Sequence, residues 1–582
     1  MNLKSISLAI VCIALMASLT SRSASADWPA LGRALTTAGK GQQRPKTTTD
    51  GAGGAIVVWH DDRSPRVDIF AQHVLVSGEV DPAWPVDGRA LLGDSAAQEA
   101  AFEGQQSPVI VSDGAGGAIV AWPDGRSETR GLDIFAQHVL ATGVLDPAWP
   151  VNGLALSAVR GDQDNPAIAS DGAGGAIVTW TDGRSGVTGV DVFAQHVLIS
   201  GVVDPAWPVN GVALSTAPEL QSSPQIVSDG LGGAIVTWTD FRPSATGVDV
   251  YAQHVRSSGI VDPAWPVNGR ALALAAGVQS NPSIVSDGAH GALFAWEDFR
   301  DGTDHIYAQR LLGSGAIAAG WLADGLAVAT APLGQEHPIV ASDGRSGALV
   351  AWQDLRNGQN HNPFVQHVLA SGAIDPAWPV NGRALSLSSG EEVDASIVTD
   401  VAGGAIVAWE EDSFIFANHV LASGALDPTF PVNGRFMRLL LTFQRNPDLT
   451  VSSGGNAIVA WSDRSQTETA IYAQQVLTEE TLAVDPGTPG STVAFARPNP
   501  NPARGPVTLS FALPREAAVQ LVIYDVSGRR VRELMSGMQA AGRHEVAWDQ
   551  RDDGGRLVAA GIRFARLEVE GRALTEKVVT TR

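Results

Sequence analysis

The chain repeats one segment many times, and its clearest copy reads Ser170-Asp-Gly-Ala-Gly-Gly-Ala-Ile-Val-Thr-Trp-Thr-Asp182. Glycines accept positive φ, so Asp-Gly-x-Gly-Gly predicts a tight hairpin, and Ala-Ile-Val-Thr-Trp predicts a strand covered on both faces. The tryptophan recurs at Trp59, Trp122, Trp180, Trp238, Trp296, Trp352, Trp409 and Trp461. A spacing of about 57 residues favours propeller blades over helical repeats.

Two further elements complete each unit. Val190-Asp-Val-Phe-Ala-Gln-His-Val-Leu198 follows the tryptophan, and Asp204-Pro-Ala-Trp-Pro-Val-Asn-Gly-Val-Ala-Leu214 follows that. Together with the apolar run after Ser223-Pro, each unit offers four short strands separated by turn residues. A four-stranded propeller blade lies between two neighbours, which explains a second strand that is apolar almost without alternation.

The two ends of the repeat region complement each other. The Trp-Pro element appears at Trp28–Leu35, before any complete unit, whereas no such element follows the last unit after Thr478. An N-terminal strand in the last blade would remove exposed sheet edges. We therefore predict an all-β fold: an eight-bladed β-propeller over residues 27–480, closed by the strand that carries Trp28 and Leu35, in which the repeated tryptophans are structural.

The N-terminus reads as a signal peptide over residues 1–26. Lys4 precedes the apolar run Ile6–Leu19, and Ala24-Ser-Ala26 is a small-residue cleavage site. The only cysteine, Cys12, lies within it, so the exported chain has no disulfide and no thiolate site. These features predict a protein that is extracellular or on the outer-membrane surface, with no transmembrane segment.

Net charge limits the partners. The formal charge is −22, and so acidic a chain repels phosphates, which disfavours nucleic acid as a partner. The partners that remain are a glycan or a protein at the cell surface.

The composition changes at the C-terminal end. A Pro/Gly-rich linker covers residues 481–506, and Val507, Leu509, Phe511 and Leu513 then alternate as in a half-buried strand. Short strands with turn signals predict a small Ig-like β-sandwich over residues 507–582.

Several motifs of this tail carry a family resemblance. Asn499-Pro-Asn-Pro502, Ile523-Tyr-Asp-Val-Ser-Gly-Arg-Arg-Val-Arg-Glu-Leu534 and Ala541-Gly-Arg-His-Glu-Val-Ala-Trp-Asp549 resemble the immunoglobulin-like domain of flagellar hook-capping proteins. They also resemble the C-terminal sorting domain of type IX secretion substrates. That resemblance implies a bacterial protein, carried across the outer membrane by the secretion machinery and released or fixed at the surface. Ile562-Arg-Phe-Ala565 departs from the aromatic run usual there, and a plain Ig-like spacer is the alternative. The N-terminal region resembles, more loosely, β-propeller repeat proteins with such tails.

The repeated polar residues do not form a recognisable reaction centre. Asp182 and Arg184 represent a Trp-x-Asp-x-Arg pattern, which is either a ring of carboxylates for cations or a salt bridge that fixes a loop. We favour the salt bridge because the arginine neutralises the carboxylate locally. The single carboxylate of Asp-Gly-Ala-Gly-Gly is a weak calcium signal, and the histidines occur once per unit, never at metal-ligand spacing. The sequence thus predicts no cofactor, no catalytic or metal site, and no enzyme.

Loop variation indicates where a ligand would bind. The connections that vary, such as Gly93–Gln106 and Asn357–Pro363, belong to one face of the predicted disc. A rigid scaffold with one diversified face is typical of binding proteins, although neutral drift is an alternative. The predicted function is a non-catalytic binding or scaffold protein. The alternative is an extracellular glycoside-acting enzyme, which would need two carboxylates about 5–10 Å apart in the channel mouth.

Overall fold

The computed structural model describes most of the chain in two compact units, residues 1–478 and 479–582. The described residues are 28–29, 31–63, 68–92, 108–127, 131–186, 189–242, 244, 246–438, 442–464, 468–477, 494–495, 503, 505–513, 515–525, 529–540, 542–569 and 572–580. The predicted signal peptide, most of the predicted linker and the variable loop 93–106 lie outside them. Within these residues only the 3₁₀ turn η3 (Ser453–Gly455) is helical, so the all-β prediction is confirmed.

The described part of the first unit contains eight four-stranded antiparallel sheets, which we number in chain order. Sheet 1 comprises β2 (Gln42–Thr49), β3 (Ala55–Asp61), β4 (Asp68–Val74) and β5 (Arg89–Ala90). Sheet 2 comprises β6 (Val109–Ser112), β7 (Ala118–Ser127), β8 (Gly131–Val139) and β9 (Leu154–Ser157). Sheet 3 comprises β10 (Gln163–Ser170), β11 (Ala176–Asp182), β12 (Asp191–Val197) and β13 (Val212–Ser215). Sheet 4 comprises β14 (Gln221–Ser228), β15 (Ala234–Asp240), β16 (Asp249–Val255) and β17 (Arg270–Ala271).

The remaining sheets follow the same order, except for the last. Sheet 5 comprises β18 (Gln279–Ser286), β19 (Ala292–Asp298), β20 (His305–Leu311) and β21 (Leu326–Ala329). Sheet 6 comprises β22 (Gln335–Ser342), β23 (Ala348–Asp354), β24 (Asn362–Val368) and β25 (Arg383–Ala384). Sheet 7 comprises β26 (Glu392–Thr399), β27 (Ala405–Glu411), β28 (Phe414–Val420) and β29 (Arg435–Phe436). Sheet 8 comprises β30 (Phe443–Val451), β31 (Ala457–Arg464), β32 (Thr469–Val476) and the N-terminal β1 (Arg33–Ala34).

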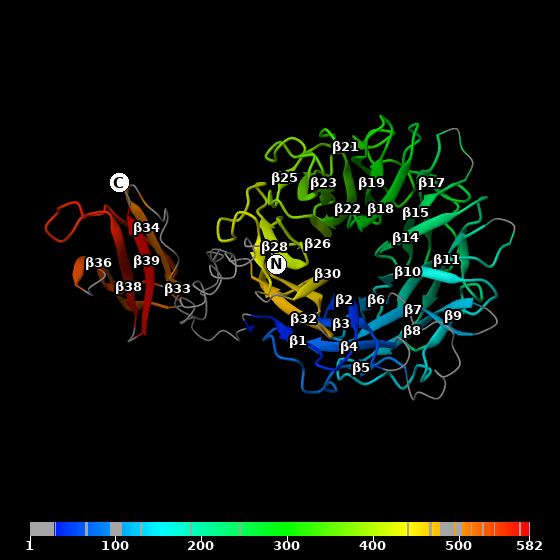
Figure 1. The fold of residues 1–582 in the computed structure, drawn as a ribbon, viewed down its shortest axis with the longest axis horizontal. Coiled ribbons are helices and arrows are strands. Elements are labelled where there is room, and N and C mark those ends of the chain that lie inside the picture. The colour runs from blue at the N-terminus through cyan, green and yellow to red at the C-terminus, as the bar shows by residue number, and fades with distance from the viewer. Residues whose placement is uncertain are drawn as a thin grey trace, which may run out of the picture. The chain divides into compact units, whose positions relative to one another are not determined.

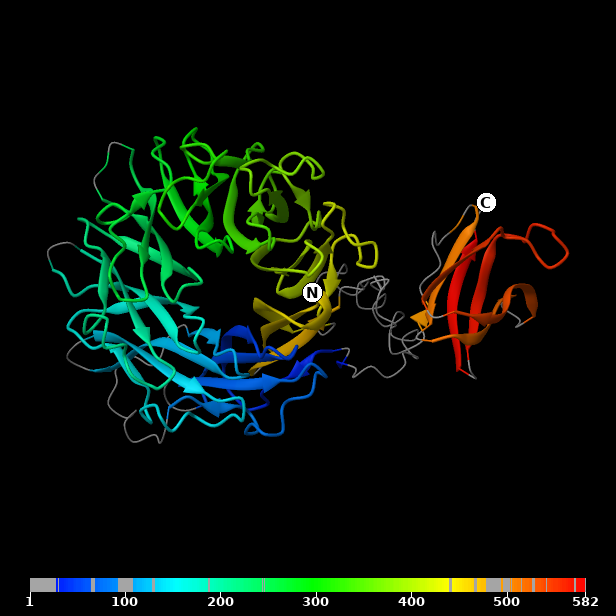
Figure 2. The same ribbon diagram turned by 180° about the vertical axis from the view of Figure 1, so that it is seen from behind.

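The sheets are arranged as in a propeller. Figures 1 and 2 show them following one another around a ring, with the first strand of each sheet innermost and the fourth outermost. Each first strand contacts the first strands of its two neighbours, and β30 of sheet 8 contacts β2 of sheet 1. There, Lys46 Nζ lies 3.0 Å from Asp448 Oδ1, and the Thr47 amide donates to Asp448 Oδ2 at 2.7 Å.

Burial explains the apolar second strands. Every residue of β11 is buried, because the sheets on both sides cover it. All eight repeated tryptophans are fully buried at the end of such a strand. The hairpin before β11 turns at Gly172 (φ 77°) and Gly174 (φ 90°), conformations that glycine adopts at no steric cost.

Residues 28–35 take the fourth-strand place of sheet 8. Arg33 and Ala34 pair with Ala473 and Tyr472 of β32, and the Leu35 amide donates to the Ile471 carbonyl at 2.8 Å. Trp28 Nε1 donates to the Val76 carbonyl of sheet 1 at 3.1 Å, as Trp149 Nε1 donates to the Ile199 carbonyl of the next sheet at 3.0 Å. Sheet 8 therefore contacts sheet 1 through the same bond that joins consecutive sheets elsewhere.

The antiparallel order gives the first unit two faces. On the hairpin face, strand one turns into strand two and strand three into strand four. On the opposite, variable-loop face, strand two leads to strand three and strand four to the next sheet. Near that face each first strand except β6 has a bulge, as between Asp164 and Ala167, where Asn165 has φ 51° although a proline follows. The described counterparts of Asn165 are Arg44, Ser223, Asn281, His337, Asp394 and Asn446, all with φ between 50° and 54°.

The second unit is a two-sheet sandwich. One sheet comprises β33 (Ala494–Phe495), β34 (Val507–Leu513) and β37 (Gly542–Trp548). The other comprises β35 (Ala517–Asp525), β36 (Arg530–Gln539), β38 (Gly561–Val569) and β39 (Arg572–Thr580). Val507, Leu509, Phe511 and Leu513 are buried in its core against Trp548, as their alternation predicted.

Candidate ligand-binding face

A cluster of tryptophan, aspartate and arginine fixes the loop after the second strand. In sheet 3, Trp180 Nε1 donates to Asp182 Oδ2 at 2.8 Å, and Arg184 Nε donates to Asp182 Oδ1 at 2.8 Å. The Arg184 guanidinium also lies 3.9 Å from the centre of the Phe193 ring. Both oxygens of the buried Asp182 carboxylate accept hydrogen bonds from the chain itself, so the arginine neutralises the carboxylate locally in each sheet that has this cluster. The same cluster occurs at Trp59–Asp61–Arg63, Trp122–Asp124–Arg126, Trp238–Asp240–Arg242, Trp296–Asp298–Arg300 and Trp352–Asp354–Arg356.

The repeated histidines lie on the hairpin face. His196 Nδ1 lies 2.9 Å from Asp204 Oδ2, and its Nε2 lies 3.0 Å from Asp171 Oδ2. His73, His138, His254, His367 and His419 are each held between two aspartates in the same way. Burial opposes the charged ring, but bonds to Asp400 and Asp427 raise the pKa of His419 above its usual value. Among the described residues, no three His, Cys, Asp or Glu side chains are grouped to hold a metal ion.

Sheet 7 breaks the cluster. Glu411 stands where the other sheets have aspartate, no arginine follows it, and Trp409 Nε1 has no hydrogen-bond partner in the described chain. Glu411 pairs across the strands with Glu392, which replaces the glutamine that begins β10 and four other first strands. Glu392 is 1% exposed and accepts from Asn362 Nδ2 at 2.7 Å. Burial above all, with the nearby Glu411 charge, raises the pKa of Glu392 to about 8, against the hydrogen bonds from Ser386 and Asn362.

Sheet 8 alters the cluster in another way. Arg464 follows Asp463 directly, one position earlier than the arginine of sheets 1 to 6, and its side chain makes no hydrogen bond or ion pair with any described residue. Arg438 takes the vacant place: its Cζ lies 3.5 Å from the centre of the Tyr472 ring, and its Nε lies 3.3 Å from Asp463 Oδ2.

We define the inner rim as three positions per sheet at the variable-loop end of the innermost strands. These are the two residues after the position of Gln163 in strand one, and the residue after the repeated tryptophan, which pairs across from the first of them. The described inner rim comprises Gln43, Arg44 and His60; Asp164, Asn165 and Thr181; Ser222, Ser223 and Thr239; Ser280, Asn281 and Glu297; Glu336, His337 and Gln353; Val393, Asp394 and Glu410; and Arg445, Asn446 and Ser462. The described rim position of sheet 2 is Pro123. The surrounding framework repeats, whereas the rim residues differ from sheet to sheet and are polar apart from Pro123 and Val393.

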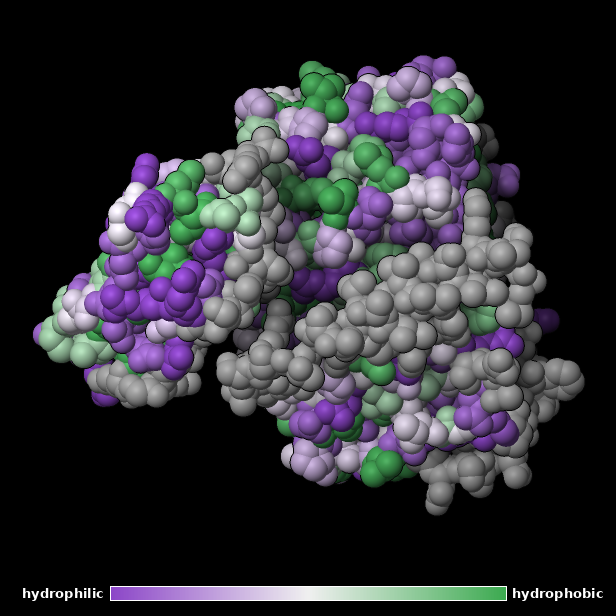
Figure 3. All heavy atoms as spheres, turned by 60° about the vertical axis from the view of Figure 1, so that its left-hand side comes forward, coloured by the Kyte–Doolittle hydropathy of each residue, from purple (hydrophilic) through white to green (hydrophobic). Residues whose placement is uncertain are grey.

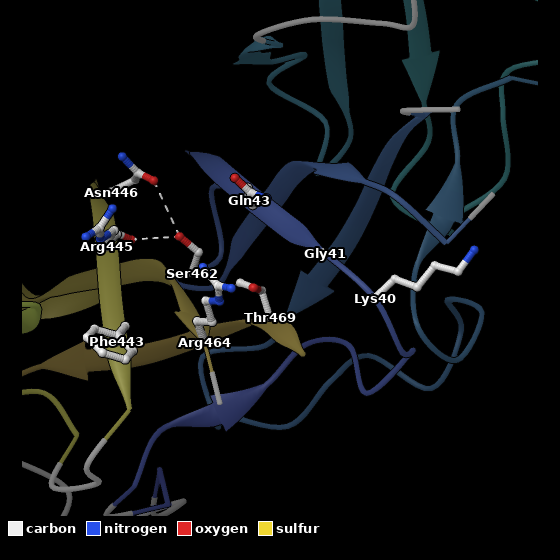
Figure 4. A pocket seen from close by; sticks show the side chains of 9 residues that line it. All are labelled: Lys40, Gly41, Gln43, Phe443, Arg445, Asn446, Ser462, Arg464 and Thr469. Atoms are coloured by element: carbon white, nitrogen blue, oxygen red, sulfur yellow. Dashed lines mark hydrogen bonds between the residues drawn. The ribbon is translucent and has the colours of Figure 1, made fainter. Parts of the chain in front are cut away.

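Two hollows open beside the inner rim. One, of about 300 Å³, is lined by Arg44, Lys46, Asp394 and Asn446 from sheets 1, 7 and 8. The other, of about 460 Å³, lies between sheets 8 and 1 and shares Asn446 with the first. Figure 4 shows Arg445, Arg464 and Phe443 of sheet 8 around it, with Gln43 of sheet 1 opposite.

Charge is unevenly distributed around the rim. Sheets 5 to 7 contribute Glu297, Glu336, Asp394 and Glu410, whereas sheets 8 and 1 contribute Arg445 and Arg44. Burial, together with the Asp394 charge, raises the pKa of Glu410, although Arg445 Nε lies 3.7 Å from its Oε1. The rim thus carries both charge signs, but Glu297 and Glu410, which follow the repeated tryptophans, are buried.

Sequence reasoning found the framework and missed the rim. Trp28, Leu35, Asp182, Arg184 and the repeated tryptophans lie in the framework. The inner rim and Glu392 were not singled out, and Arg464 was counted, in a compressed copy, as a member of the Trp-x-Asp-x-Arg pattern. Position-by-position comparison of the repeats contains the signal of all three. A side chain that differs from its counterparts in an otherwise strict repeat is not needed to build the framework, so it is a candidate for ligand binding.

Comparison with known proteins identifies part of the chain. Residues 501–565 match the model of the FlgD Ig-like domain, which confirms the Ig-like prediction, while the sorting role stays a prediction. No curated protein matches. In the described chain no helix is long and apolar enough to cross a membrane.

Solved structures resemble the propeller part at low identity. The α-L-arabinanase of Penicillium chrysogenum, complexed with arabinobiose, is 13% identical over 54% of this chain and 93% of its own, with a TM-score of 0.33. The Hadza microbial sialidase Hz136 is 12% identical over 60% and 74%, with a TM-score of 0.30. The β-propeller domain of the Trilobed protease from Pyrococcus furiosus is 7% identical over 64% and 94%, with a TM-score of 0.36.

These similarities correct one prediction. The prediction that the chain is not an enzyme is contradicted, because structures that resemble it include an arabinanase, an arabinofuranosidase and a sialidase. The absence of a catalytic motif in the sequence is too weak a ground to exclude an enzyme. With TM-scores below 0.5, however, the matches transfer no residue or reaction to this chain.

Proposed function

We propose that this protein is an extracellular carbohydrate-binding protein that holds a glycan at the inner rim, beside sheets 7, 8 and 1. The observation that carries the proposal is the contrast between the repeated framework and the differing, polar rim. A rigid scaffold positions such side chains without further ordering cost. The non-glycine residues with positive φ add to this, because strained backbone concentrates at functional sites.

Exposed aromatic rings support a carbohydrate as the ligand. The large phenylalanines exposed among the described residues are Phe241, Phe299, Phe436 and Phe443, at 40% to 59%, and each lies at the variable-loop face. Hydrophobic residues on the side seen in Figure 3 lie in small groups among hydrophilic ones. Single rings beside amide, hydroxyl and charged groups suit the apolar faces and hydroxyls of a sugar.

A glycan array probed with the full chain tests this proposal. We expect binding to at least one glycan, and about a tenfold loss of affinity for the variant Arg44→Ser, since Arg44 lines the rim. Serine occupies the same position and backbone conformation at Ser223, so the fold should tolerate it. The control is Leu231→Ala on the hairpin face. Alanine occupies the equivalent position of sheet 3, as Ala173. An array without binding, or equal losses in both variants, would reject a glycan site at the rim.

Cleavage of the bound glycoside is a second candidate function. Burial and the Asp394 charge raise the pKa of Glu410, and glycosidases use a pair of carboxyl groups of which one has a raised pKa. To test cleavage, the release of reducing ends from the bound glycan is measured in the same experiment. The variant Glu410→Gln should abolish this release. A bound glycan that stays intact would leave binding as the function.

We also propose that the eight sheets form a closed eight-bladed propeller. The contacts of β2 with β30, the pairing of β1 with β32 and the bond from Trp28 to Val76 support closure.

The second unit serves export in this proposal. Its match to an Ig-like family and the signal peptide predicted from the sequence support a C-terminal sorting domain. Deletion of residues 497–582 should leave the protein in the periplasm, as measured by surface proteolysis and fractionation of cells. Normal surface display of the truncated chain would contradict a sorting role and favour a spacer.

A further inference from the structure

Arg464 of sheet 8 does not take part in the cluster of tryptophan, aspartate and arginine that fixes the loop in other sheets. In six sheets the arginine two residues after the aspartate is bound to that aspartate and covers an aromatic ring, as Arg184 does. Arg438, from the segment before β30, performs both tasks in sheet 8. Arg464 is therefore not needed by the framework, and it is exposed.

The strand register places Arg464 in a patch with three other side chains. Phe443 pairs directly with Arg464, and Arg445 pairs directly with Ser462. Residues opposite each other, and residues two apart on one strand, point to the same side of a sheet. The four side chains consequently lie on one side of the β30–β31 ladder. The Phe443 residue is 59% exposed and the Arg445 side chain 63% exposed.

This patch forms one wall of the cavity of about 460 Å³ in Figure 4. Gly41 and Gln43 of sheet 1 line the other side, and the described residues that line the cavity include no acidic one. Glu410, whose Oε1 lies 3.7 Å from Arg445 Nε, is not among them. Lys40 also borders it, but its Nζ donates to the Arg63 carbonyl at 3.2 Å, and in Figure 4 its side chain points away from the two arginines. In a chain of net charge −22, the cavity is a local site for an anion.

We propose that Arg445 and Arg464 bind the carboxylate of an acidic sugar residue whose ring lies against Phe443. This proposal rests on the proposed carbohydrate-binding function and adds the class of sugar. Guanidinium groups bind planar carboxylates through paired hydrogen bonds, and the exposed Gln43 amide can bind a sugar hydroxyl. The aromatic ring distinguishes a sugar acid from a free inorganic anion, which would not use it.

The test compares two ligands that differ at their carboxyl groups, which are charged in one and methyl-esterified and uncharged in the other. Binding of the full chain to oligogalacturonate is measured by calorimetry beside the same oligomer with methyl-esterified carboxylates. We expect the esterified oligomer and the variant Arg464→Gln each to lose about tenfold in affinity, and Phe443→Ala to weaken binding as well. Arg345→Gln, an exposed arginine on the hairpin face, removes equal charge and should bind as the original chain does.

The outcomes separate this inference from the proposed function. Equal binding of the two oligomers, or unchanged binding by Arg464→Gln, overturns the acidic-sugar site while leaving carbohydrate binding in place. Displacement of the oligomer by millimolar sulfate, with no effect of Phe443→Ala, would show a plain anion site and also overturn it. A chain that binds no glycan of any kind overturns both proposals.

Discussion

Replacement of Leu35 by alanine is expected to lower the free energy of unfolding of the first unit by about 3 kcal/mol. Leu35 is only 2% exposed, and it packs with Trp59 of sheet 1 and Ile471 of sheet 8. Its removal leaves a cavity where the N-terminal strand joins the two ends of the repeat. Denaturation by urea, followed through tryptophan fluorescence, measures the effect.

A neighbouring leucine provides the matched control. Leu31 belongs to the same segment but is 40% exposed, so Leu31→Ala should change stability by less than about 0.5 kcal/mol. Deletion of residues 28–35 should have a larger effect, because it leaves the β32 edge unpaired and open to aggregation. If Leu35→Ala unfolds at the same urea concentration as Leu31→Ala, the N-terminal strand does not hold the ring together.

The closing strand was predictable because it is a copy of a repeated element. Trp28 and Leu35 recur in register with Trp207 and Leu214, so their place in sheet 8 follows from the repeat alone. The contact between Asp182 and Arg184 could also be predicted from the sequence, because two residues of separation allow a local salt bridge.

The inner rim could not be derived in this way. A residue before proline is ordinarily extended, yet Asn165 has φ 51°, because the bulge in β10 overrides the local preference. The replacement of Arg464 by Arg438 joins residues from separate segments, which only the fold brings together. Similarly, Glu392 and Glu411 meet only once the strand register is known.

The buried carboxyl pair of sheet 7 predicts an unusual pH dependence. The pKa of Glu392 is raised to about 8 in the folded chain, against an ordinary value of 4.5, so the folded state keeps a proton that the unfolded state loses. Stability is therefore fully present below pH 4.5 and decreases towards pH 8, by about 1.4 kcal/mol per pH unit. Glu392→Gln removes this titration and restores the glutamine that begins β10. The free energy of unfolding of the variant should therefore exceed that of the original chain by an amount that grows by about 1.4 kcal/mol per pH unit.

Urea denaturation of the original chain, Glu392→Gln and Glu391→Gln at pH 5, 6, 7 and 8 measures this difference. Glu391 is the matched control because its side chain is 50% exposed and bonded to His361 Nδ1, outside the buried pair. Glu392→Gln should equal the original chain near pH 5 and exceed it increasingly up to pH 8, whereas Glu391→Gln should follow the original chain throughout. Parallel curves for all three proteins would mean that Glu392 ionises in the folded state as it does in water. Sheet 7 would then hold two charged carboxylates with no loss of stability. Because Glu392 is only 1% exposed, such an arrangement would require a bound cation.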